Sequence, residues 1–226
     1  MNNNKKTNII ILILLGVSLA GLLTVYPHLP QIIPIHWNFK GQVDGYGSKN
    51  MIFFLWGIAV AVNALFIIVA KIDPRSENYK RFAKVYNIFR IFFTLFFIST
   101  LVITVILTFD PDAFNINMRI MPMLGLMFAL IGNYLPKCKH NYSFGIRTPW
   151  TLASENVWNK THRMAAPIWV VCGVLFMVMG FLPANMIGEA GMLIITFVLL
   201  GPLVVIPMIY SYIEFKKEKQ QNEKDN

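Results

Sequence analysis

The run NIFRIFFTLFFISTLVITVILTF, residues 87–109, decides the class of fold. Its only charged residue is Arg90, near one end of the run. About 20 apolar residues are needed to cross a hydrocarbon core about 30 Å thick. The run is therefore long enough for a transmembrane helix, and we expect the Arg90 side chain to extend to the membrane interface.

Similar apolar runs recur along the chain, which is 56% hydrophobic and only 14% charged. Six spans are predicted, at Ile9 to Tyr26, Met51 to Ala70, Asn87 to Phe109, Ile120 to Leu135, Ala165 to Leu182 and Met192 to Ile213. None carries Arg, Lys or Asp at its centre, where each would cost about 2.5 to 3.5 kcal/mol. The sequence thus predicts an all-α, multi-pass integral protein of the cell membrane.

The net charge of +9 indicates topology rather than nucleic-acid binding. Positive charge accumulates in the cytoplasmic flanks of membrane spans. When alternate flanks are compared, Lys40, Lys49 and Arg119 fall on one side, and the other seventeen of the 20 Lys and Arg fall on the opposite side. We therefore expect both termini in the cytoplasm and no direct nucleic-acid contact.

The first span leaves one alternative open. Lys5 and Lys6 precede an apolar run that contains Ser18-Leu19-Ala20, a small-x-small pattern typical of signal-peptide cleavage. The apolar run continues as far as Val25, which favours a full span. Either alternative places the next loop outside the cell.

That outside loop, residues 27–50, is one of two long loops in which we expect function. Pro30 and Pro34 disfavour helix and Asp44-Gly45 is a turn signal, so the loop is predicted to form a compact, hairpin-like cap. The candidate residues for binding an extracellular peptide are His36, Trp37, Asn38, Asp44 and Tyr46. The alternative is a structural cap whose aromatic residues anchor it at the lipid headgroups.

The second long loop, residues 136–163, is expected in the cytoplasm. Thr148 followed by Pro149 is typical of a helix N-cap and first helical position. An amphipathic helix is predicted to follow at the membrane surface, with Trp150 and Trp158 as anchors. Its basic side is predicted to face anionic headgroups and consists of Lys160, His162 and Arg163.

Arg147 is the residue that separates a binding surface from a plain linker. A guanidinium can grip a carboxylate or a group of carbonyls through its planar fork, and Lys replaces it poorly there. Further hydrogen bonds could come from Asn133, Asn141 and Tyr142. We therefore predict that Arg147→Lys impairs function nearly as much as Arg147→Ala.

These motifs resemble the signature of the SdpI family of bacterial multi-pass membrane proteins. The resemblance is carried by Gly132-Asn133-Tyr134-Leu135-Pro136, the run from Asn141 to Leu152, Val157-Trp158 and Thr161-His162-Arg163. The stretch from Pro34 to Lys49 is similar to the N-terminal domain of unknown function of the longer members. The resemblance implies immunity to a secreted peptide toxin and, as in some members, signalling by capture of a cytoplasmic transcriptional repressor.

The residues assigned to partner binding or to the structural motif are Asn133, Pro136, Asn141, Tyr142, Gly145, Arg147, Thr148, Pro149, Trp150, Trp158, His162 and Arg163. Three parts of the chain are expected. Residues 1–86 form a two-span unit with the extracellular loop 27–50, residues 87–213 form a four-span SdpI-like region with the cytoplasmic loop 136–163, and residues 214–226 form a charged cytoplasmic tail.

Catalysis and metal binding find little support in the sequence. Cys138 with His140 gives only two candidate metal ligands, and Glu155 is the only acid in the inside loop. We therefore expect no enzyme, no cofactor and no metal, and a function that rests on binding. The alternative is a small-molecule or lipid transporter or flippase, because the two long loops follow the first and fourth spans on opposite sides, as in inverted repeats.

Small and polar residues within the spans are expected to pack helices together. Asn63 lies well inside the second span, and an interhelical hydrogen bond is expected for it. Three pairs of small residues have the i, i+4 spacing, and at least some should face a neighbouring helix. They are Gly16 with Ala20, Gly57 with Ala61 and Gly125 with Ala129.

Overall fold

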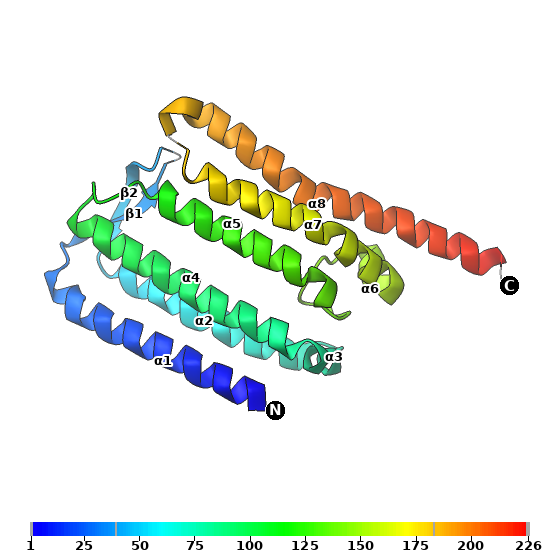
Figure 1. The fold of residues 1–226 in the computed structure, drawn as a ribbon. Coiled ribbons are helices and arrows are strands. Elements are labelled where there is room, and N and C mark those ends of the chain that lie inside the picture. Colours follow the sequence, from blue (N-terminus) through cyan, green and yellow to red (C-terminus); the bar gives the residue numbers. More distant parts are fainter. Residues whose placement is uncertain (1, 39, 183, 225–226) are drawn as a thin grey trace.

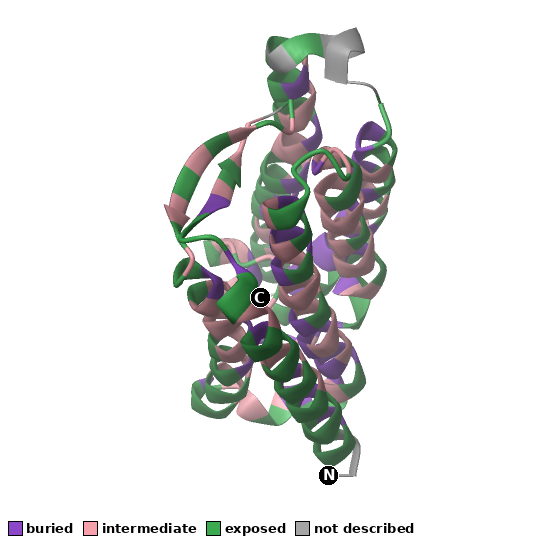
Figure 2. Ribbon diagram, turned by 90° about the vertical axis from the view of Figure 1, so that its left-hand side faces the viewer, coloured by how far each residue is buried: buried purple, intermediate pink, exposed green. Residues whose placement is uncertain are grey.

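The structure is a computed structural model that describes residues 2–38, 40–182 and 184–224. In this part of the chain, six helices are long and apolar enough to cross a membrane, which confirms the all-α, multi-pass membrane fold. They are α1 (Asn2–Val25), α2 (Met51–Ile72), α4 (Ala83–Phe109), α5 (Asn117–Tyr134), α7 (Glu155–Met179) and α8 (Ala184–Lys224). Exposed residues run along much of the length of these helices (Figure 2), as expected where lipid replaces water as solvent.

The long helices form two groups of three (Figure 1). In the first group α1 and α2 pack against α4, and in the second α7 packs against both α5 and α8. Both termini lie at one end of the bundle, which we call the inner end, together with the short helices α3 (Ser76–Arg81) and α6 (Pro149–Ala153). A two-stranded hairpin lies at the opposite, outer end (Figure 1). The charge count predicts that the inner end is cytoplasmic.

Close packing of α5 on α7 depends on glycine. A Cβ atom added to Gly132 would lie 2.7 Å from the carbonyl oxygen of Ala166, and one added to Gly173 would lie 2.5 Å from the backbone nitrogen of Ala129. The pair Gly125 and Ala129 therefore faces a neighbouring helix, as expected. The other two glycines with this spacing, Gly16 and Gly57, meet nothing within 4 Å among the described residues.

The inside loop differs from the prediction. Thr148 does cap a helix, since its side chain accepts a hydrogen bond from the backbone of Thr151, but α6 ends at Ala153. Ser154 then caps α7, whose Glu155 start lies well before the predicted span. The prediction of a separate amphipathic helix at the membrane surface is therefore wrong. The second half of the predicted helix forms the first turns of the membrane-spanning helix α7.

The outer hairpin pairs β1 (Ile32–Trp37) with β2 (Val43–Ser48) in antiparallel register. At its turn, the Asn38 side-chain oxygen accepts hydrogen bonds from the backbone nitrogens of Lys40 and Gln42, and Gly41 has a φ of 79°. The predicted turn at Asp44-Gly45 is wrong, because this dipeptide lies within β2, where the pairing register shifts. Two short 3-10 turns, η1 (Tyr26–His28) and η2 (Leu135–Lys137), follow α1 and α5.

Two polar residues within the spans have defined partners. The Asn63 side chain donates to the Thr94 hydroxyl at 2.7 Å, which confirms the expected bond between α2 and α4. Arg90 does not extend to the interface as predicted, because its side chain turns into the bundle, where the residue is only 5% exposed. Its guanidinium instead donates to the Asn8 side chain on α1 at 2.9 Å.

Candidate functional site

The outer hairpin exposes one face of its two strands. Alternate residues of a strand share a face, and Ile32, His36, Asp44 and Tyr46 are all exposed. His36 Nδ1 lies 2.5 Å from Asp44 Oδ1, and Tyr46 and Ile32 are 65% and 64% exposed. We call these four residues the hairpin face. Three of the five predicted toxin-binding residues therefore lie together on an exposed surface.

The other two predicted residues hold the hairpin in place. Trp37 is half-buried and packs against Ile103, Leu107 and Ile116 at the outer ends of α4 and α5. Asn38 organises the turn through the hydrogen bonds described above. The opposite side of β1 is anchored by Ile33, which is fully buried in a cluster with residues of α1, α2 and α4. The hairpin face is thus presented by a fixed support.

At the inner end, Asn141 organises the loop that precedes α6. The residue is fully buried. Its side-chain oxygen accepts hydrogen bonds from the backbone nitrogens of Ser143 and Phe144 at 2.9 and 2.6 Å, and its amide nitrogen donates to the Lys139 and Phe144 carbonyls. This predicted motif residue therefore shapes its own loop.

Asp73, at the C-terminal end of α2, ties that loop to the first helix group. Its Oδ2 accepts hydrogen bonds from the Tyr79 hydroxyl, the Tyr142 backbone nitrogen and the Ser143 hydroxyl, each at 2.9 Å. Its Oδ1 accepts from the Arg75 backbone nitrogen at 2.8 Å. Burial raises the pKa of this carboxyl, but the four hydrogen bonds outweigh that effect and hold the pKa below its ordinary value. We call Asp73 with these four partners the Asp73 cluster.

The sequence reasoning missed Asp73. The signal that could have drawn attention to it is an acid placed directly after an apolar span, in a flank that is otherwise rich in Lys and Arg. The loop that it contacts lies about 70 positions further along the chain, and no local pattern connects the two.

Trp158 and His162 lie in the interior and do not face headgroups. Both are buried, and their rings stack with centroids 4.1 Å apart. Trp158 Nε1 donates to the Cys138 carbonyl at 3.0 Å. His162 Nδ1 donates to the Trp158 carbonyl at 2.8 Å, and its Nε2 accepts from the Ile146 backbone nitrogen at 3.0 Å. The predicted surface roles of these two residues are therefore wrong, because the loop between η2 and α6 covers them. We call this loop, residues 138–148, the inner loop.

Gly145 is required where the loop crosses His162. Its φ is 121°, and an added Cβ atom would lie 2.5 Å from the ring nitrogen Nε2 of His162. A larger side chain would be costly here, both because of the backbone conformation and because of the close approach to His162.

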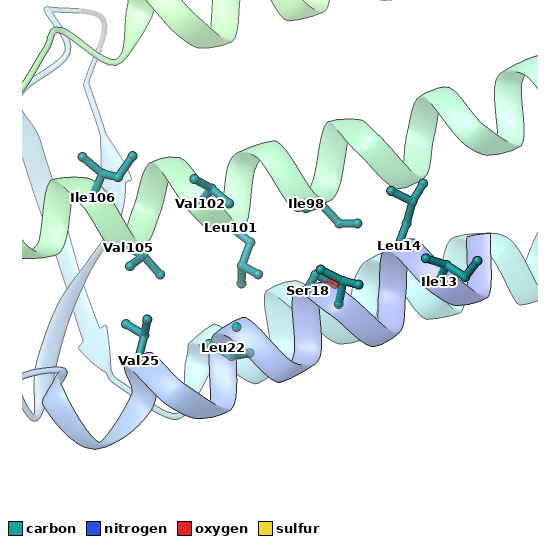
Figure 3. A pocket seen from close by; sticks show the side chains of 12 residues that line it. Ile13, Leu14, Ser18, Leu22, Val25, Ile98, Leu101, Val102, Val105 and Ile106 are labelled. Atoms are coloured by element: carbon teal, nitrogen blue, oxygen red, sulfur yellow. The ribbon is translucent and has the colours of Figure 1, made fainter. Parts of the chain in front are cut away.

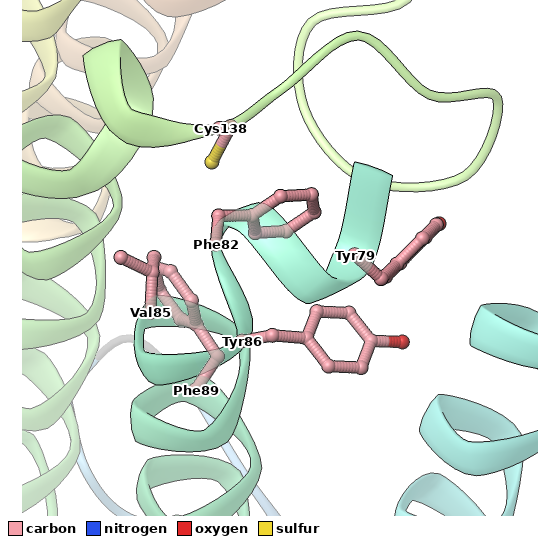
Figure 4. Packing of buried hydrophobic residues seen from close by; sticks show 6 residues of the cluster. All are labelled: Tyr79, Phe82, Val85, Tyr86, Phe89 and Cys138. Carbon is pink, nitrogen blue, oxygen red and sulfur yellow. The ribbon is translucent and has the colours of Figure 1, made fainter. Parts of the chain in front are cut away.

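An aromatic cluster supports the same loop from below (Figure 4). The buried members are Tyr79, Phe82, Val85, Tyr86, Phe89 and Cys138, and Phe144 of the loop packs against them. Burial raises the pKa of the Cys138 thiol to about 12. The thiol is therefore protonated and shielded as long as the loop is closed.

The remaining motif residues lie nearer the surface. The Thr148 hydroxyl donates to the Ser211 hydroxyl of α8 at 3.0 Å, and the Trp150 ring lies 5.1 Å from that of Tyr212. Arg147 is exposed, and one of its guanidinium nitrogens donates to the Tyr142 carbonyl at 3.1 Å. The exposed motif residues are Asn133, Pro136, Tyr142, Gly145, Arg147, Pro149 and Arg163.

An apolar groove of about 480 Å³ lies between α1 and α4 within the membrane region (Figure 3). Its walls include Leu14, Leu22, Leu101 and Val105. Because its lining is hydrocarbon almost throughout, lipid chains can fill it without loss of hydrogen bonds.

The fold and these loops define a multi-pass membrane protein with an exposed outer hairpin and a tightly bonded inner loop. Residues 137–211 match the model of the SdpI/YfhL protein family, and residues 11–60 match a domain of unknown function, DUF1648. The chain thus has a region similar to the SdpI family after a region similar to that N-terminal domain, and the resemblance found in the motifs is confirmed.

A curated relative supports the same assignment. The chain is 28% identical over 214 residues to a Bacillus subtilis (strain 168) protein named Immunity protein SdpI, and the match covers 94% of this chain and 97% of the relative. No solved structure matches the chain.

Proposed function

We propose that this chain is a membrane immunity protein that protects by binding a secreted peptide toxin at the outer hairpin face. A membrane immunity role is supported by the name of the relative, which is similar along nearly its whole length. The observation that carries the proposed site is the hairpin face itself, where Tyr46 and Ile32 are exposed beside the His36 and Asp44 pair.

The chemistry of this face suits an amphipathic peptide. A tyrosine ring offers a large apolar surface with a hydroxyl at its tip, and aromatic residues contribute strongly to binding at interfaces. The neighbouring imidazole and carboxylate can exchange hydrogen bonds with a peptide backbone. Since Trp37 and Ile33 fix the hairpin on the helix ends, little conformational entropy is lost on binding.

Protection assays test this proposal. Variants Tyr46→Ala and His36→Ala are expressed in Bacillus subtilis that lacks its own immunity protein, and the cells are exposed to toxin-secreting cells. Both should lower survival relative to the parent chain at equal membrane abundance. The matched control Gln42→Ala changes an exposed residue of the same hairpin outside this face and should keep protection. If both variants of the hairpin face protect fully, the hairpin does not bind the toxin and is a structural cap.

We further propose that the inner loop captures a cytoplasmic repressor through Arg147. The supporting observation is that this guanidinium is exposed and uses one nitrogen for the Tyr142 carbonyl, so much of its fork can meet a carboxylate. Membrane pull-downs from cells with the parent chain, Arg147→Lys and Arg147→Ala should show the same partner lost in both variants. A repressor bound equally by Arg147→Lys would contradict the role of the fork.

The transporter or flippase alternative predicts a different result. Uptake of a substrate into vesicles, or lipid exchange between their leaflets, should then depend on the chain. An immunity protein that acts by binding moves no substrate, so vesicles with and without it should behave alike.

A further inference from the structure

Arg90 is a buried cation whose charge is not balanced within the bundle. It is 5% exposed, and its Nε is buried without a hydrogen-bond partner among the described residues. Its other nitrogens donate to the side-chain oxygens of Asn8 at 2.9 Å and Asn87 at 3.4 Å. No carboxylate of the described residues forms an ion pair with it. A guanidinium held away from water without an anion is costly, so such residues are functional candidates.

Arg90 lines a pocket of about 670 Å³ at the inner end of the first helix group. The pocket lies between the first turns of α1, the ends of α2 and α3, and the start of α4. Its cationic lining consists of Lys71, Lys80 and Arg90, whereas Glu77 is the acid among the lining residues and is paired with Lys80 at 2.7 Å. The lining therefore carries an excess of positive charge.

The same pocket has a second, apolar side. Phe66, Ile67 and Ala70, within the last two turns of α2, line it. Asn4, Asn8 and Asn87 supply amide groups on the polar side. Cations and amides beside an apolar wall fit a ligand that has an anionic head and a hydrocarbon chain.

Arg90 lies below the level of the headgroups. It lies on the second turn of α4, about 10 Å along the helix axis from Ala83, at a rise of about 1.5 Å per residue. The headgroup region is about 5 to 8 Å thick on each side, so Arg90 lies a few ångströms below it when the polar end of α4 lies at the membrane surface. A phosphate that contacts Arg90 therefore has to enter the pocket from its rim.

We propose that this pocket binds the phosphate of an anionic phospholipid from the leaflet at the inner end. The phosphate accepts hydrogen bonds from the Arg90 guanidinium, whose planar fork matches phosphate oxygens, and Lys71 and Lys80 add attraction at the rim. The acyl chain follows the apolar wall on α2. This site is separate from the hairpin face and does not depend on the immunity proposal.

Lipid titration of the purified full chain tests the proposal. In detergent, native mass spectrometry measures binding of phosphatidylglycerol and of phosphatidylcholine with identical chains. We expect the parent chain to prefer phosphatidylglycerol and Arg90→Met to bind it about tenfold more weakly. The control Arg81→Met removes an exposed cation at the same end, outside this pocket, and should keep the preference.

A surface variant guards against misfolding of Arg90→Met. Lys71 is exposed, so Lys71→Met should fold normally and weaken phosphatidylglycerol binding about fivefold, which corresponds to about 1 kcal/mol. No lipid preference in the parent chain, or the same preference in Arg90→Met and Lys71→Met as in the parent, would overturn the site.

An inorganic phosphate arm identifies the source of the phosphate group. Millimolar phosphate should compete weakly with phosphatidylglycerol, because it lacks the acyl chain that contacts α2. If phosphate displaces the lipid completely and stabilises the parent chain equally, the ligand is free phosphate and the lipid assignment is wrong.

Discussion

Asp73→Asn should loosen the inner loop from the first helix group. The substitution keeps the shape of the side chain and replaces one acceptor oxygen by an NH₂ donor. If the remaining oxygen faces Tyr79, Tyr142 and Ser143, the NH₂ group meets the Arg75 backbone nitrogen, and that hydrogen bond is lost. The other orientation loses three hydrogen bonds.

The expected magnitude follows from the better orientation. Hydrogen bonds to a charged group contribute about 1.5 to 3 kcal/mol, against about 0.5 to 1.5 kcal/mol between neutral groups. Three weakened bonds and one lost bond would sum to about 6 kcal/mol if they were independent. Because all four share one carboxylate charge, they do not add in full, and we expect the stability of the closed loop to fall by about half of that sum, about 3 kcal/mol. Each 1.4 kcal/mol is about tenfold in an equilibrium, so loop opening should increase about a hundredfold.

Labelling of Cys138 measures this opening. Cys138 is 2% exposed, and burial raises the pKa of its thiol to about 12, so a thiol reagent reacts only when the loop opens. Purified protein with Cys172→Ala in the background leaves this single thiol. Asp73→Asn should speed labelling about a hundredfold, whereas Asp112→Asn, which removes an exposed acid from the outer end, should not. Equal labelling rates with and without Asp73→Asn would refute the role assigned to the Asp73 cluster.

The same carboxylate gives the protein an acid-sensitive contact. Because the pKa of Asp73 is lower in the folded state than its ordinary value of 3.8, its contribution to stability is fully present above that value. The contribution is lost as the pH falls through the lower folded-state pKa. Thermal unfolding in detergent between pH 7 and pH 3 should therefore show an acid loss of stability that is smaller in Asp73→Asn.

Three further predictions concern topology and packing. Gln42→Cys should react with an impermeant thiol reagent in intact cells, and Asn159→Cys only after permeabilisation. The reverse result would invert the assigned orientation. Asn159→Cys is used as the inner reporter because native Cys138 is too buried. Gly125→Leu should destabilise the detergent-solubilised protein by about 3 kcal/mol because it separates α5 from α7, whereas Gly57→Leu, which meets open space, should have a melting temperature near that of the parent. Gly145→Ala should cost about 2 kcal/mol through its positive φ and its contact with His162, and should also speed Cys138 labelling; an unchanged rate would contradict this account.

Features with a local physical cause were predictable from the sequence. The length of an apolar run sets whether a helix can span the bilayer, and this property does not depend on neighbouring segments. The hairpin cap and the Thr148 N-cap also follow from residues a few positions apart. The prediction failed where one local signal competed with another, as when Asn38 and Gly41 formed the turn and Asp44-Gly45 entered a strand.

Tertiary structure alone decided how the polar residues are used. Trp158 and His162 share the spacing expected of a surface helix, but the sequence cannot tell whether that face meets lipid headgroups or a folded loop. Asp73 and Ser143 are far apart in the chain and carry no common pattern, so their hydrogen bond exists only because the two helix groups meet. Arg90 could have reached the interface, yet the position of Asn8 on α1 draws it inward. Whether a segment spans the membrane depends on its own length and hydrophobicity, whereas the geometry of a site depends on which distant segments become neighbours.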